Sequence, residues 1–394
     1  MIYYDKFDYN GYKPLNLLKG DFMNYCMQYL KTENVNLVKD MGMIPYKLYE
    51  LYGFNSWVST FENGKYPYLE KEVKGLKIDF VKRYFNNYTL DGTIHLWKNS
   101  KNIDILQIFH VTLSSVVYAY MYKFRNKKGK LYLKLDCSYK LPERINSLNA
   151  VGKSILKKFF NKIDLISVEQ EKLYDDLIEA APYLKEKLVN IPNGLDFKYM
   201  KTIDVNYDYD KKENIILTVA RIGAEEKRID MLLEAFASID NVESLGWKLH
   251  LVGPIEEGFK KNIEEFYCKH PALKDLVVFK GNIENREELY KEYAKAKIFT
   301  LTSEFESFAF VFIEAAALGD VIVSTDVGIA RELIDGDNGK VVDINDRDGF
   351  KDALIKYMTQ SDLKECSEKT RNLCLEKFDW DNIIKKLHGY LSRL

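Results

Sequence analysis

Short apolar stretches alternate with amphipathic stretches along most of this chain of 394 residues. The apolar stretches have the residue types and period of β-strands, and the stretches between them repeat their apolar residues with the period of a helix. Such alternation predicts βα units that assemble into parallel sheets. In the first half, the predicted strands are residues 35–39, 56–61, 76–81, 103–109, 131–136, 165–168 and 188–191.

A polar stretch at residues 200–213 interrupts this alternation, which then begins again. We therefore predict an α/β protein with two doubly wound, Rossmann-like domains, 1–199 and 214–377, joined by a linker. Such sheets bind ligands beyond the carboxyl ends of their strands, so the cleft between the domains is the expected site. Residues 1–34 are expected to be an N-terminal extension, and residues 378–394 a helix that returns to the first domain. In the second half, the predicted strands are residues 214–220, 247–252, 277–279, 298–302, 321–324 and 340–342.

Composition narrows the class of protein. Apolar residues make up 46% and charged residues 30% of the chain, which is ordinary for globular domains. The net charge of −1 lacks the excess of Lys and Arg expected of a nucleic-acid-binding protein. The five cysteines show no CxxC spacing, and neither a membrane span nor a signal-peptide pattern is evident. We therefore expect a cytoplasmic protein with free thiols.

Two glutamates, Glu306 and Glu314, are separated by seven residues where a predicted strand gives way to a helix. The strand brings the first carboxylate to the rim of the sheet. The start of the helix offers unpaired N–H groups and a partial positive charge, which suit a phosphate. Carboxylates that bind hydroxyls beside a phosphate site would fit a sugar joined to a nucleoside diphosphate. Two solvated glutamates beside a buried helix are the alternative interpretation.

Two cations follow the first strand of the second domain. Arg221 comes directly after the predicted strand, and Lys227 comes just before the next predicted helix. Both can point into the cleft, where Arg offers a planar fork for phosphate oxygens and Lys a mobile point charge. Ordinary surface charges at Lys227 and Arg228 are the alternative.

Taken together, these residues resemble the retaining glycosyltransferases of family 4, which have the GT-B architecture. The resemblance covers most of the second domain in order and spacing. It also includes the run Ile191-Pro192-Asn193-Gly194 at the end of the first domain and the aromatic-rich C-terminal helix. The matching segments of the second domain are Ala220-Arg221 with Lys227, Leu251-Val252-Gly253-Pro254, Gly281-Asn282-Ile283, Glu306 with Glu314, and Ser324-Thr325-Asp326-Val327-Gly328.

The resemblance implies a role for each matching residue. Arg221 and Lys227 would neutralise the diphosphate of the donor, a nucleotide sugar that is expected to carry UDP. Glu314 would accept hydrogen bonds from the ribose, and Glu306 would hold hydroxyls of the transferred sugar as a catalytic residue. The first domain would bind the acceptor. The donor would also meet backbone groups of Ile283, Phe308, Ala309 and Phe310, although the family usually has glycine where Ser307 or Ala309 stands.

In the first domain, three residues are expected at the cleft because each lies near the end of a predicted strand. Gly42, ahead of a helix predicted to begin near Pro45, is assigned to the acceptor side. His110 and Asp136 are expected to be catalytic. The family more often has histidine at the position of Asp136, where a carboxylate can equally accept a hydrogen bond from a sugar hydroxyl. A plain turn at Gly42 and a structural His110 are the alternatives, and Lys134 is expected to face solvent.

Two further segments carry weaker signals. The stretch Asp208-Tyr209-Asp210 has the DxD spacing of a metal site but lies in the linker, so we expect solvated carboxylates and no metal. Residues 153–162 form a basic, amphipathic segment. We expect a scaffold helix with a charged outer face there, with weak peripheral docking at the inner face of the membrane as the second interpretation.

The predicted function is transfer of a sugar from a nucleotide sugar to a hydroxyl acceptor with retention at the anomeric carbon. The acceptor would be a cell-surface glycan, a glycolipid or another lipid-linked acceptor, or a glycoprotein. No cofactor and no nucleic-acid partner is expected. Two alternatives stay open, namely a non-catalytic GT-B partner of another glycosyltransferase and a nucleotide-sugar epimerase or hydrolase of the same architecture.

Overall fold

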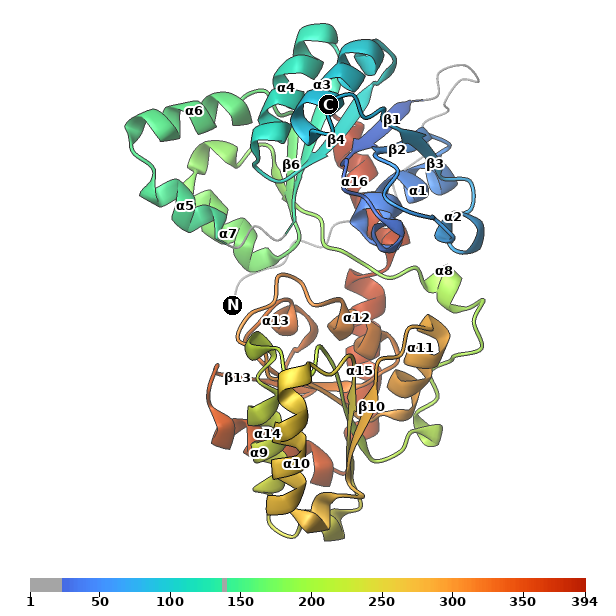
Figure 1. Ribbon diagram of the computed structural model, residues 1–394, viewed down its shortest axis with the longest axis vertical. Helices are drawn as coiled ribbons and strands as arrows, with labels where there is room; N and C mark the ends of the chain where they lie inside the picture. Colours follow the sequence, from blue (N-terminus) through green and yellow to red (C-terminus); the bar gives the residue numbers. More distant parts are fainter. Residues whose placement is uncertain (1–22, 137–139) are drawn as a thin grey trace.

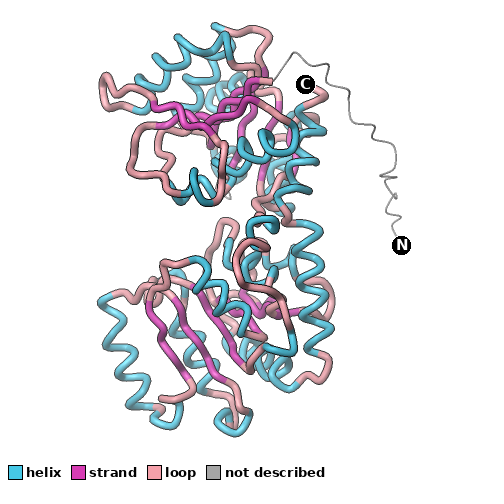
Figure 2. Tube along the Cα trace, turned by 90° about the vertical axis from the view of Figure 1, so that its right-hand side faces the viewer, coloured by secondary structure: helices cyan, strands magenta, loops and turns pink. Residues whose placement is uncertain are grey.

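The computed structural model describes residues 23–136 and 140–394. They form two α/β domains, one above the other in Figure 1, and each domain has a sheet with helices packed around it (Figure 2). Every strand pairing in both sheets is parallel. The predicted pair of doubly wound domains is therefore confirmed.

The first domain contains a seven-stranded sheet of order β3-β2-β1-β4-β5-β6-β7. The strand order changes direction between β1 and β4, and ligands of such sheets bind at the carboxyl ends of the strands at this point. His110 directly follows β4 and therefore lies at this edge. The strands are β1 Asn24–Gln28, β2 Asn55–Thr60, β3 Lys77–Phe80, β4 Ile105–Phe109, β5 Lys130–Leu135, β6 Leu165–Val168 and β7 Leu188–Asn190.

The second domain contains a six-stranded sheet of order β10-β9-β8-β11-β12-β13. Here the order changes direction between β8 and β11. Arg221 comes shortly after β8, and Glu306 comes shortly after β11, so both belong to the edge where a ligand is expected. The strands are β8 Ile215–Val219, β9 Lys248–Val252, β10 Val277–Gly281, β11 Ile298–Leu301, β12 Val321–Thr325 and β13 Gly339–Val342.

Two predictions for the start of the chain are wrong. The expected extension 1–34 contains β1, which lies inside the first sheet between β2 and β4, while its residues 1–22 lie outside the described part. The predicted strand 35–39 is instead a 3₁₀ helix, Asn34–Val38, that leads into α1. Polar Asn24 and Gln28 flank the short apolar centre of β1 and hid its strand character in the sequence.

The helices follow the predicted alternation. Those of the first domain are α1 Asp40–Tyr52, α2 Tyr68–Lys71, α3 Tyr88–Asn99, α4 Leu113–Arg125, α5 Leu141–Ser147, α6 Ala150–Phe160 and α7 Glu171–Ala180. After α8, Phe197–Met200, the second domain has α9 Ile229–Ala237, α10 Lys260–Lys269, α11 Arg286–Lys295, α12 Phe310–Ala317, α13 Ala330–Leu333, α14 Arg347–Thr359 and α15 Leu363–Lys377. The last helix is α16, Trp380–Leu391.

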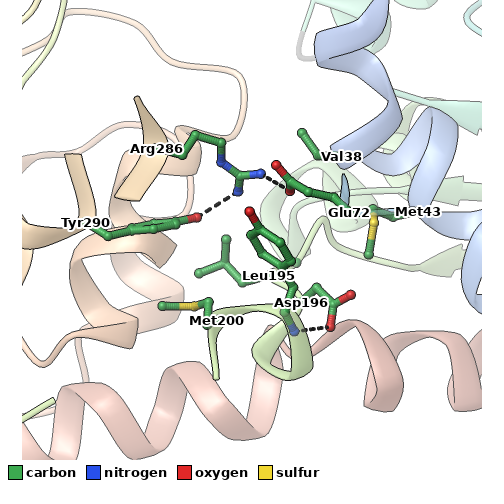
Figure 3. A pocket seen from close by; sticks show the side chains of 10 residues that line it. Val38, Met43, Glu72, Leu195, Asp196, Met200, Arg286 and Tyr290 are labelled. Carbon is green, nitrogen blue, oxygen red and sulfur yellow. Dashed lines mark hydrogen bonds and ion pairs between the residues drawn. The ribbon is translucent and has the colours of Figure 1, made fainter. Parts of the chain in front are cut away.

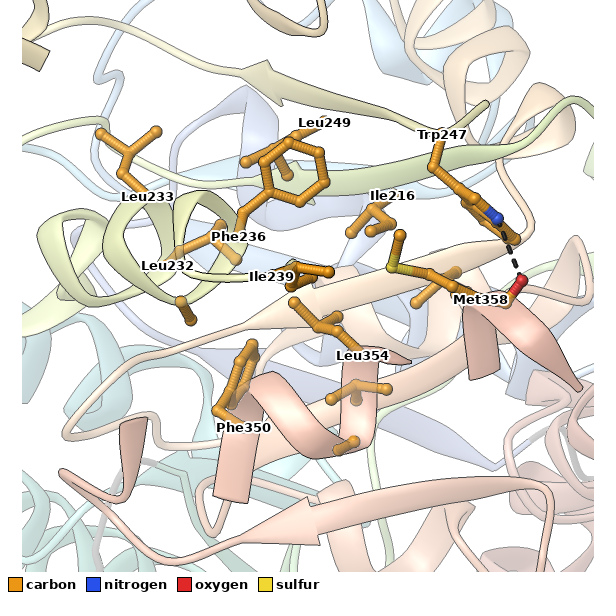
Figure 4. Packing of buried hydrophobic residues seen from close by; sticks show 14 of the residues in the cluster. Ile216, Leu232, Leu233, Phe236, Ile239, Trp247, Leu249, Phe350, Leu354 and Met358 are labelled. Atoms are coloured by element: carbon orange, nitrogen blue, oxygen red, sulfur yellow. Dashed lines mark hydrogen bonds between the residues drawn. The ribbon is translucent and has the colours of Figure 1, made fainter. Parts of the chain in front are cut away.

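Buried apolar residues cover both faces of each sheet. In the second domain, Phe236 of α9 and Leu354 of α14 pack in one cluster with Ile216 and Leu249 of the strands (Figure 4). The indole of Trp247 is buried at the edge of this cluster and donates a hydrogen bond of 3.1 Å to the carbonyl oxygen of Met358. This packing supports the strands whose ends carry the candidate site.

The C-terminal helix α16 packs on the first domain, beside α1 (Figure 1). Its residues Trp380, Ile384 and Leu387 share an apolar cluster with Tyr25 and Met27 of β1. The chain therefore crosses between the domains twice, once after β7 and once between α15 and α16.

The two crossings run side by side. The amide of Leu195 donates a hydrogen bond of 2.8 Å to the carbonyl of Phe378, and the amide of Trp380 donates one of 3.1 Å to the carbonyl of Leu195. A Cβ atom on Gly194 would come within 2.6 Å of the Phe378 carbonyl oxygen. Gly194 is thus the residue that permits this close approach.

The buried ammonium of Lys47, on α1, binds one carboxylate from each crossing. It lies 3.1 Å from Asp196 and 3.0 Å from Asp381, and 2.8 Å from Glu50 of its own helix. Burial alone would lower the pKa of Lys47, but these carboxylates outweigh that effect and raise it. The cation stays charged and joins both crossings to the first domain.

Gly42 illustrates a packing constraint on α1, since a Cβ there would lie 2.2 Å from the carbonyl oxygen of Leu37. We expect Gly42→Ala to lower the free energy of unfolding by about 2 kcal/mol, because backbone overlap outweighs the gain in helix propensity. Thermal unfolding followed by circular dichroism measures the change. As control, Gly389→Ala in α16 meets no atom within 4 Å and should stabilise by about 0.5–1 kcal/mol. An unchanged or raised Tm for Gly42→Ala would contradict the packing argument.

Candidate active site

Glu306 lies in the turn between β11 and α12, and its carboxylate is already bound to a cation. The Lys227 ammonium lies 2.6 Å from its Oε1 atom, and the Ser303 hydroxyl donates a hydrogen bond of 2.8 Å to the same oxygen. Both charged side chains are about 15% exposed. Two motifs that are distant in the sequence, at 227 and 306, thus meet at the edge of the second sheet.

The backbone at the start of α12 is left-handed. Ala309, the residue before the helix, has φ +65° and ψ +78°. Glycine adopts this conformation without the steric cost that Ala bears, which accounts for the glycine that the family usually has in this turn. No described residue accepts a hydrogen bond from the amides of Phe308, Ala309 or Phe310. These N–H groups are available to an anion at the helix end.

Glu314 lies one turn into α12 in a polar cluster that the sequence did not reveal. The Tyr293 hydroxyl donates a hydrogen bond of 3.1 Å to its carboxylate. Burial raises the pKa of Glu314, and the nearby charges of Arg286 and Lys39 oppose that shift. A carboxylate with few donors around it is suited to accept hydrogen bonds from vicinal hydroxyls.

Arg221 and Ile283 follow β8 and β10, two strands of the second sheet that are separated by β9. The Arg221 guanidinium is exposed, pairs with Glu226, and lies 3.9 Å from Glu256. Ile283 is in the loop that follows β10, and its side chain packs on the apolar cluster beneath α12. Like Lys227, Arg221 is neutralised by a carboxylate in this structure, so a diphosphate would replace an existing partner.

On the opposite domain, His110 and Asp136 are joined through the backbone. The Nδ1 atom of His110 lies 2.9 Å from the Asp136 carbonyl oxygen. His110 has φ +57°, which is rare for a residue with a side chain. Such strain is often found at ligand sites, where the surrounding structure holds it in place.

Behind Asp136 lies a buried polar cluster, and here the prediction that Lys134 faces solvent is wrong. Lys134 is fully buried, donates a hydrogen bond of 3.0 Å to the carbonyl of Ile191, and lies 3.7 Å from Asp40. Lys134 has no solvent-facing side because β5 is an inner strand of a parallel sheet and is buried on both faces.

Three carboxyl groups share the single charge of Lys134. Burial and the charge of Asp136 raise the pKa of Asp40, and burial together with Asp136 raises the pKa of Glu169. Asn193, from the Ile-Pro-Asn-Gly run, donates a hydrogen bond of 2.7 Å to Glu169. Since one ammonium cannot neutralise three carboxylates, this cluster retains protons directly beneath Asp136.

The two domains touch at the cleft. Gln170, after β6, donates a hydrogen bond to the Ser307 carbonyl, and the amide of Glu171 donates one of 3.1 Å to Glu332 on α13. The Lys39 ammonium lies over the Phe310 ring, 5.3 Å from its centroid. Residues from both domains therefore surround the turn that holds Glu306.

A pocket at the rear of the interface is closed by a salt bridge between Glu72 of the first domain and Arg286 of the second (Figure 3). Arg286 also donates a hydrogen bond of 2.8 Å to the Tyr290 hydroxyl. Because the same guanidinium acts on Glu314, the domain contact and the polar cluster around Glu314 are one connected system. Sequence reasoning missed Arg286, which stands at a helix start without any motif.

Comparison with known proteins identifies the second domain. Residues 200–373 match the model of the family described as glycosyl transferases, group 1. This segment belongs to the group 1 glycosyl transferases. The match confirms the resemblance of this segment at the level of the family.

Two curated relatives are 30% and 25% identical to this chain over the segments that match. The chain is 30% identical to N-acetyl-alpha-D-glucosaminyl L-malate synthase of Bacillus anthracis over 189 residues, which cover 48% of this chain and 47% of that protein. It is 25% identical to a probable sucrose-phosphate synthase of Thermosipho melanesiensis over 260 residues, 63% of this chain and 58% of the other. The matches thus span about half the length of these curated relatives.

Solved structures extend the likeness to both domains. HepE of Anabaena in complex with UDP superimposes with a TM-score of 0.72 at 16% identity, covering 94% of this chain and all of the other. The same protein has been solved in complex with UDP-glucose, with a TM-score of 0.69. At 16% identity, this structural similarity is evidence for the fold alone. It confirms the predicted GT-B architecture.

The structure also shows the surroundings of Gly42 and of the DxD stretch Asp208-Tyr209-Asp210. Gly42 lies in the first turn of α1, which begins at Asp40, so the prediction of a helix that begins near Pro45 is wrong. Lys211 pairs with Asp208 at 3.0 Å, and Lys364 pairs with Asp210 at 3.0 Å. Within residues 23–136 and 140–394, no three His, Cys, Asp or Glu side chains are grouped to hold a metal ion.

Glu332 makes the interface between the two domains sensitive to pH. Burial, together with the nearby Glu171 carboxylate, raises the pKa of Glu332 to about 7, while the hydrogen bond from the Glu171 amide and the charges of Lys377 and Lys386 oppose the shift. A carboxyl whose pKa is raised on folding binds its proton more tightly in the folded state. Its contribution is therefore fully present below the unfolded pKa of about 4.5 and is lost as the pH rises through about 7.

We expect Glu332→Gln, which mimics the protonated form, to be more stable than the parent protein by about 1–3 kcal/mol at pH 8 and nearly equal to it at pH 4.5. Thermal unfolding at both pH values measures the difference. Glu257→Gln, at an exposed position, is the control, and its difference in stability from the parent protein should be the same at both pH values. A Glu332→Gln advantage that does not depend on pH would contradict the assignment.

Proposed function

We propose that this protein transfers a sugar from a nucleoside diphosphate sugar to a hydroxyl acceptor with retention at the anomeric carbon. The observation that carries the proposal is the contact of Lys227 with Glu306 beside the free amides at the start of α12. A cation, a carboxylate and a helix end at one point match the diphosphate and the hydroxyls of one donor. The proposed donor is a UDP-sugar, supported by the fold shared with HepE, which was solved with UDP and with UDP-glucose.

In the proposed reaction, the bond between the anomeric carbon and the phosphate oxygen breaks. A bond from the acceptor oxygen to the same face of that carbon forms, and the acceptor proton passes to the departing phosphate oxygen. Arg221, Lys227 and the helix end stabilise the charge that develops on the leaving diphosphate. We assign the sugar hydroxyls to Glu306, with His110 and Asp136 facing the sugar from the other domain.

The two domains limit access of water to this reaction. The contacts of Gln170 and Glu171 with the second domain close the cleft over the turn that holds Glu306. Exclusion of water limits hydrolysis of the donor. A glycan, a lipid-linked molecule or a protein would bring its hydroxyl along the first domain, and Gly42 supports that side through the packing of α1.

We also propose that the protein works in the cytoplasm without a metal ion. The free thiols of Cys26, Cys268, Cys366 and Cys374 are compatible with a reducing compartment. Arg221 and Lys227 supply the positive charge that a metal would otherwise bring to the diphosphate. Among the described residues, no helix combines the length and apolar character of a membrane crossing.

The proposal is tested by the turnover of UDP-sugars in the presence of excess EDTA, with a panel of acceptors. We expect Arg221→Ala and Lys227→Ala each to lower kcat/KM by roughly tenfold to a thousandfold, because charge-assisted phosphate contacts are worth about 1.5–3 kcal/mol or more in a dry site. Lys291→Ala is the matched control, since Lys291 forms ion pairs only within α11.

Four outcomes would contradict this proposal. Unchanged kinetics in a folded Arg221→Ala/Lys227→Ala double variant would remove the diphosphate assignment. Activity that is lost in EDTA and restored by Mg²⁺ or Mn²⁺ would show that a metal is required. Rapid consumption of the donor without any acceptor would identify an epimerase or hydrolase, and no turnover with intact donor binding would identify a non-catalytic partner.

Substitutions of the two glutamates should affect different kinetic parameters. Glu314→Gln should mainly weaken binding of the whole nucleotide, because ribose contacts change little between ground and transition states. Glu306→Gln should mainly lower kcat, because the sugar ring gains charge as the bond breaks. Asp136→Ala should behave like Glu306→Gln. Steady-state kinetics with the UDP-sugar separates the two classes.

The control ligand for these variants is UDP alone, measured by calorimetry. Its affinity should fall in Glu314→Gln and should not fall in Glu306→Gln, where Lys227 loses its competing carboxylate and becomes freer to bind phosphate. If Glu306→Gln weakens UDP binding as much as Glu314→Gln does, the division of roles is wrong.

A further inference from the structure

Positive charge is concentrated in one part of the first domain. Residues 111–135 and 144–163, which include α4 and α6, contain eleven Lys and Arg, of which Lys134 is buried, and no Asp or Glu. The whole chain has a net charge of −1, so the remainder is strongly acidic. Such segregation creates a local positive potential that the total charge conceals.

Helix α4 presents an unusual apolar stripe to solvent. Leu113, Val117, Tyr120 and Phe124 are spaced so that they share one face of the helix. Leu113 is 74% and Phe124 68% exposed. Phe124 is stacked with the half-exposed Trp97 of α3, their ring centroids being 6.2 Å apart, so the stripe broadens at its end.

Helix α6 continues this surface with the same spacing. Val151 and Ile155 are 68% and 62% exposed, the exposed Lys158 lies on the same face, and the exposed Lys162 follows just beyond the end of the helix. The Lys162 ammonium lies over the Tyr120 ring, 5.7 Å from its centroid, and this contact joins the two helices. Helix α6 projects from the first domain on the side away from α1 (Figure 1).

This α4–α6 face, defined by the residues of the two stripes, combines aromatic and aliphatic side chains with a margin of lysines and arginines. Burying that much apolar surface in a headgroup region is favourable, and long cationic side chains remain at the phosphates. The guanidinium of Arg125 lies over the Trp97 ring, 4.3 Å from its centroid. This contact keeps a cation beside a tryptophan, a residue type that is enriched at membrane–water interfaces. A second copy of this chain would bring the same positive charge and be repelled.

The face also begins at the cleft. Helix α4 starts after the capping residue Thr112, two residues beyond His110, so Leu113 stands at the carboxyl edge of the first sheet. A bilayer in contact with α4 would therefore border the side of the cleft assigned to the acceptor. A hydroxyl carried by a lipid could reach this edge without leaving the membrane.

We propose that the α4–α6 face docks the protein on an anionic lipid bilayer. This deepens the proposed function, on which it rests for its purpose, by placing the acceptor at a membrane surface. The docking itself needs neither donor nor turnover. Failure to bind vesicles and failure to bind UDP are therefore separate results.

The test is co-sedimentation of the full chain with phosphatidylcholine vesicles that contain or lack phosphatidylglycerol. We expect binding only to the anionic vesicles, weakening steeply as salt is raised. Lys158→Glu/Lys162→Glu should lower the partition coefficient by at least about tenfold. Val151→Ser/Ile155→Ser should lower it by about tenfold through the lost apolar contact.

A matched control has the same change of charge elsewhere. Lys260→Glu/Lys261→Glu reverses two adjacent exposed lysines on α10 of the second domain and should leave vesicle binding within about twofold of the parent. UDP affinity should be the same in all these variants, which shows that each is folded. Equal loss in both lysine pairs, or no binding to anionic vesicles, would overturn the proposal. A change of oligomeric state in Val151→Ser/Ile155→Ser without loss of vesicle binding would do the same, and would assign the face to a protein partner.

Discussion

The two crossings of the chain between its domains are held together by one short main-chain bridge, and the rest of the site depends on it. Two hydrogen bonds between Leu195 and the segment Phe378–Trp380 fix the crossings side by side, and Gly194 leaves room for that contact. Lys47 then binds a carboxylate from each crossing. Both sheets therefore present their carboxyl edges to the same cleft, and any motion of the domains must turn about this point.

Charge neutralisation within the protein keeps the cleft ready for a charged ligand. Lys227 is paired with Glu306, Arg221 with Glu226, and Arg286 with Glu72, so each cation has a carboxylate partner before a ligand arrives. A diphosphate can exchange for such a partner at lower cost than it could desolvate a bare cation. The exchange at Lys227 would also free Glu306 for sugar hydroxyls, which links phosphate binding to the placement of the sugar.

Two strained residues mark the two edges of the cleft. His110 on the first domain and Ala309 on the second are non-glycine residues with a positive φ. Such backbone conformations cost of order 1–3 kcal/mol each. The strained turn at Ala309 places the free amides of α12, and the turn at His110 places the imidazole against the Asp136 backbone. In both cases, the favourable packing of the sheets supports a conformation that the local sequence would not choose.

The sequence by itself determined the two sheets and the positions of their strand ends, because alternation of apolar and polar residues is a local signal. It also predicted Arg221, Lys227, Glu306 and Glu314 as site residues, since each lies between a strand and the helix that follows it, or in that helix. It failed at β1, where the polar residues Asn24 and Gln28 hid a strand that lies inside the sheet.

Only the tertiary structure decided which of these residues meet. Lys227 and Glu306 are far apart in the chain and touch because β8 and β11 are neighbours in the sheet. The buried environment of Lys134, the action of Arg286 on Glu314, and the union of α4 and α6 into one surface likewise arise from contacts between distant segments. The physical reason is that strand order and burial are fixed by the packing of whole domains, and no stretch of sequence carries that information alone.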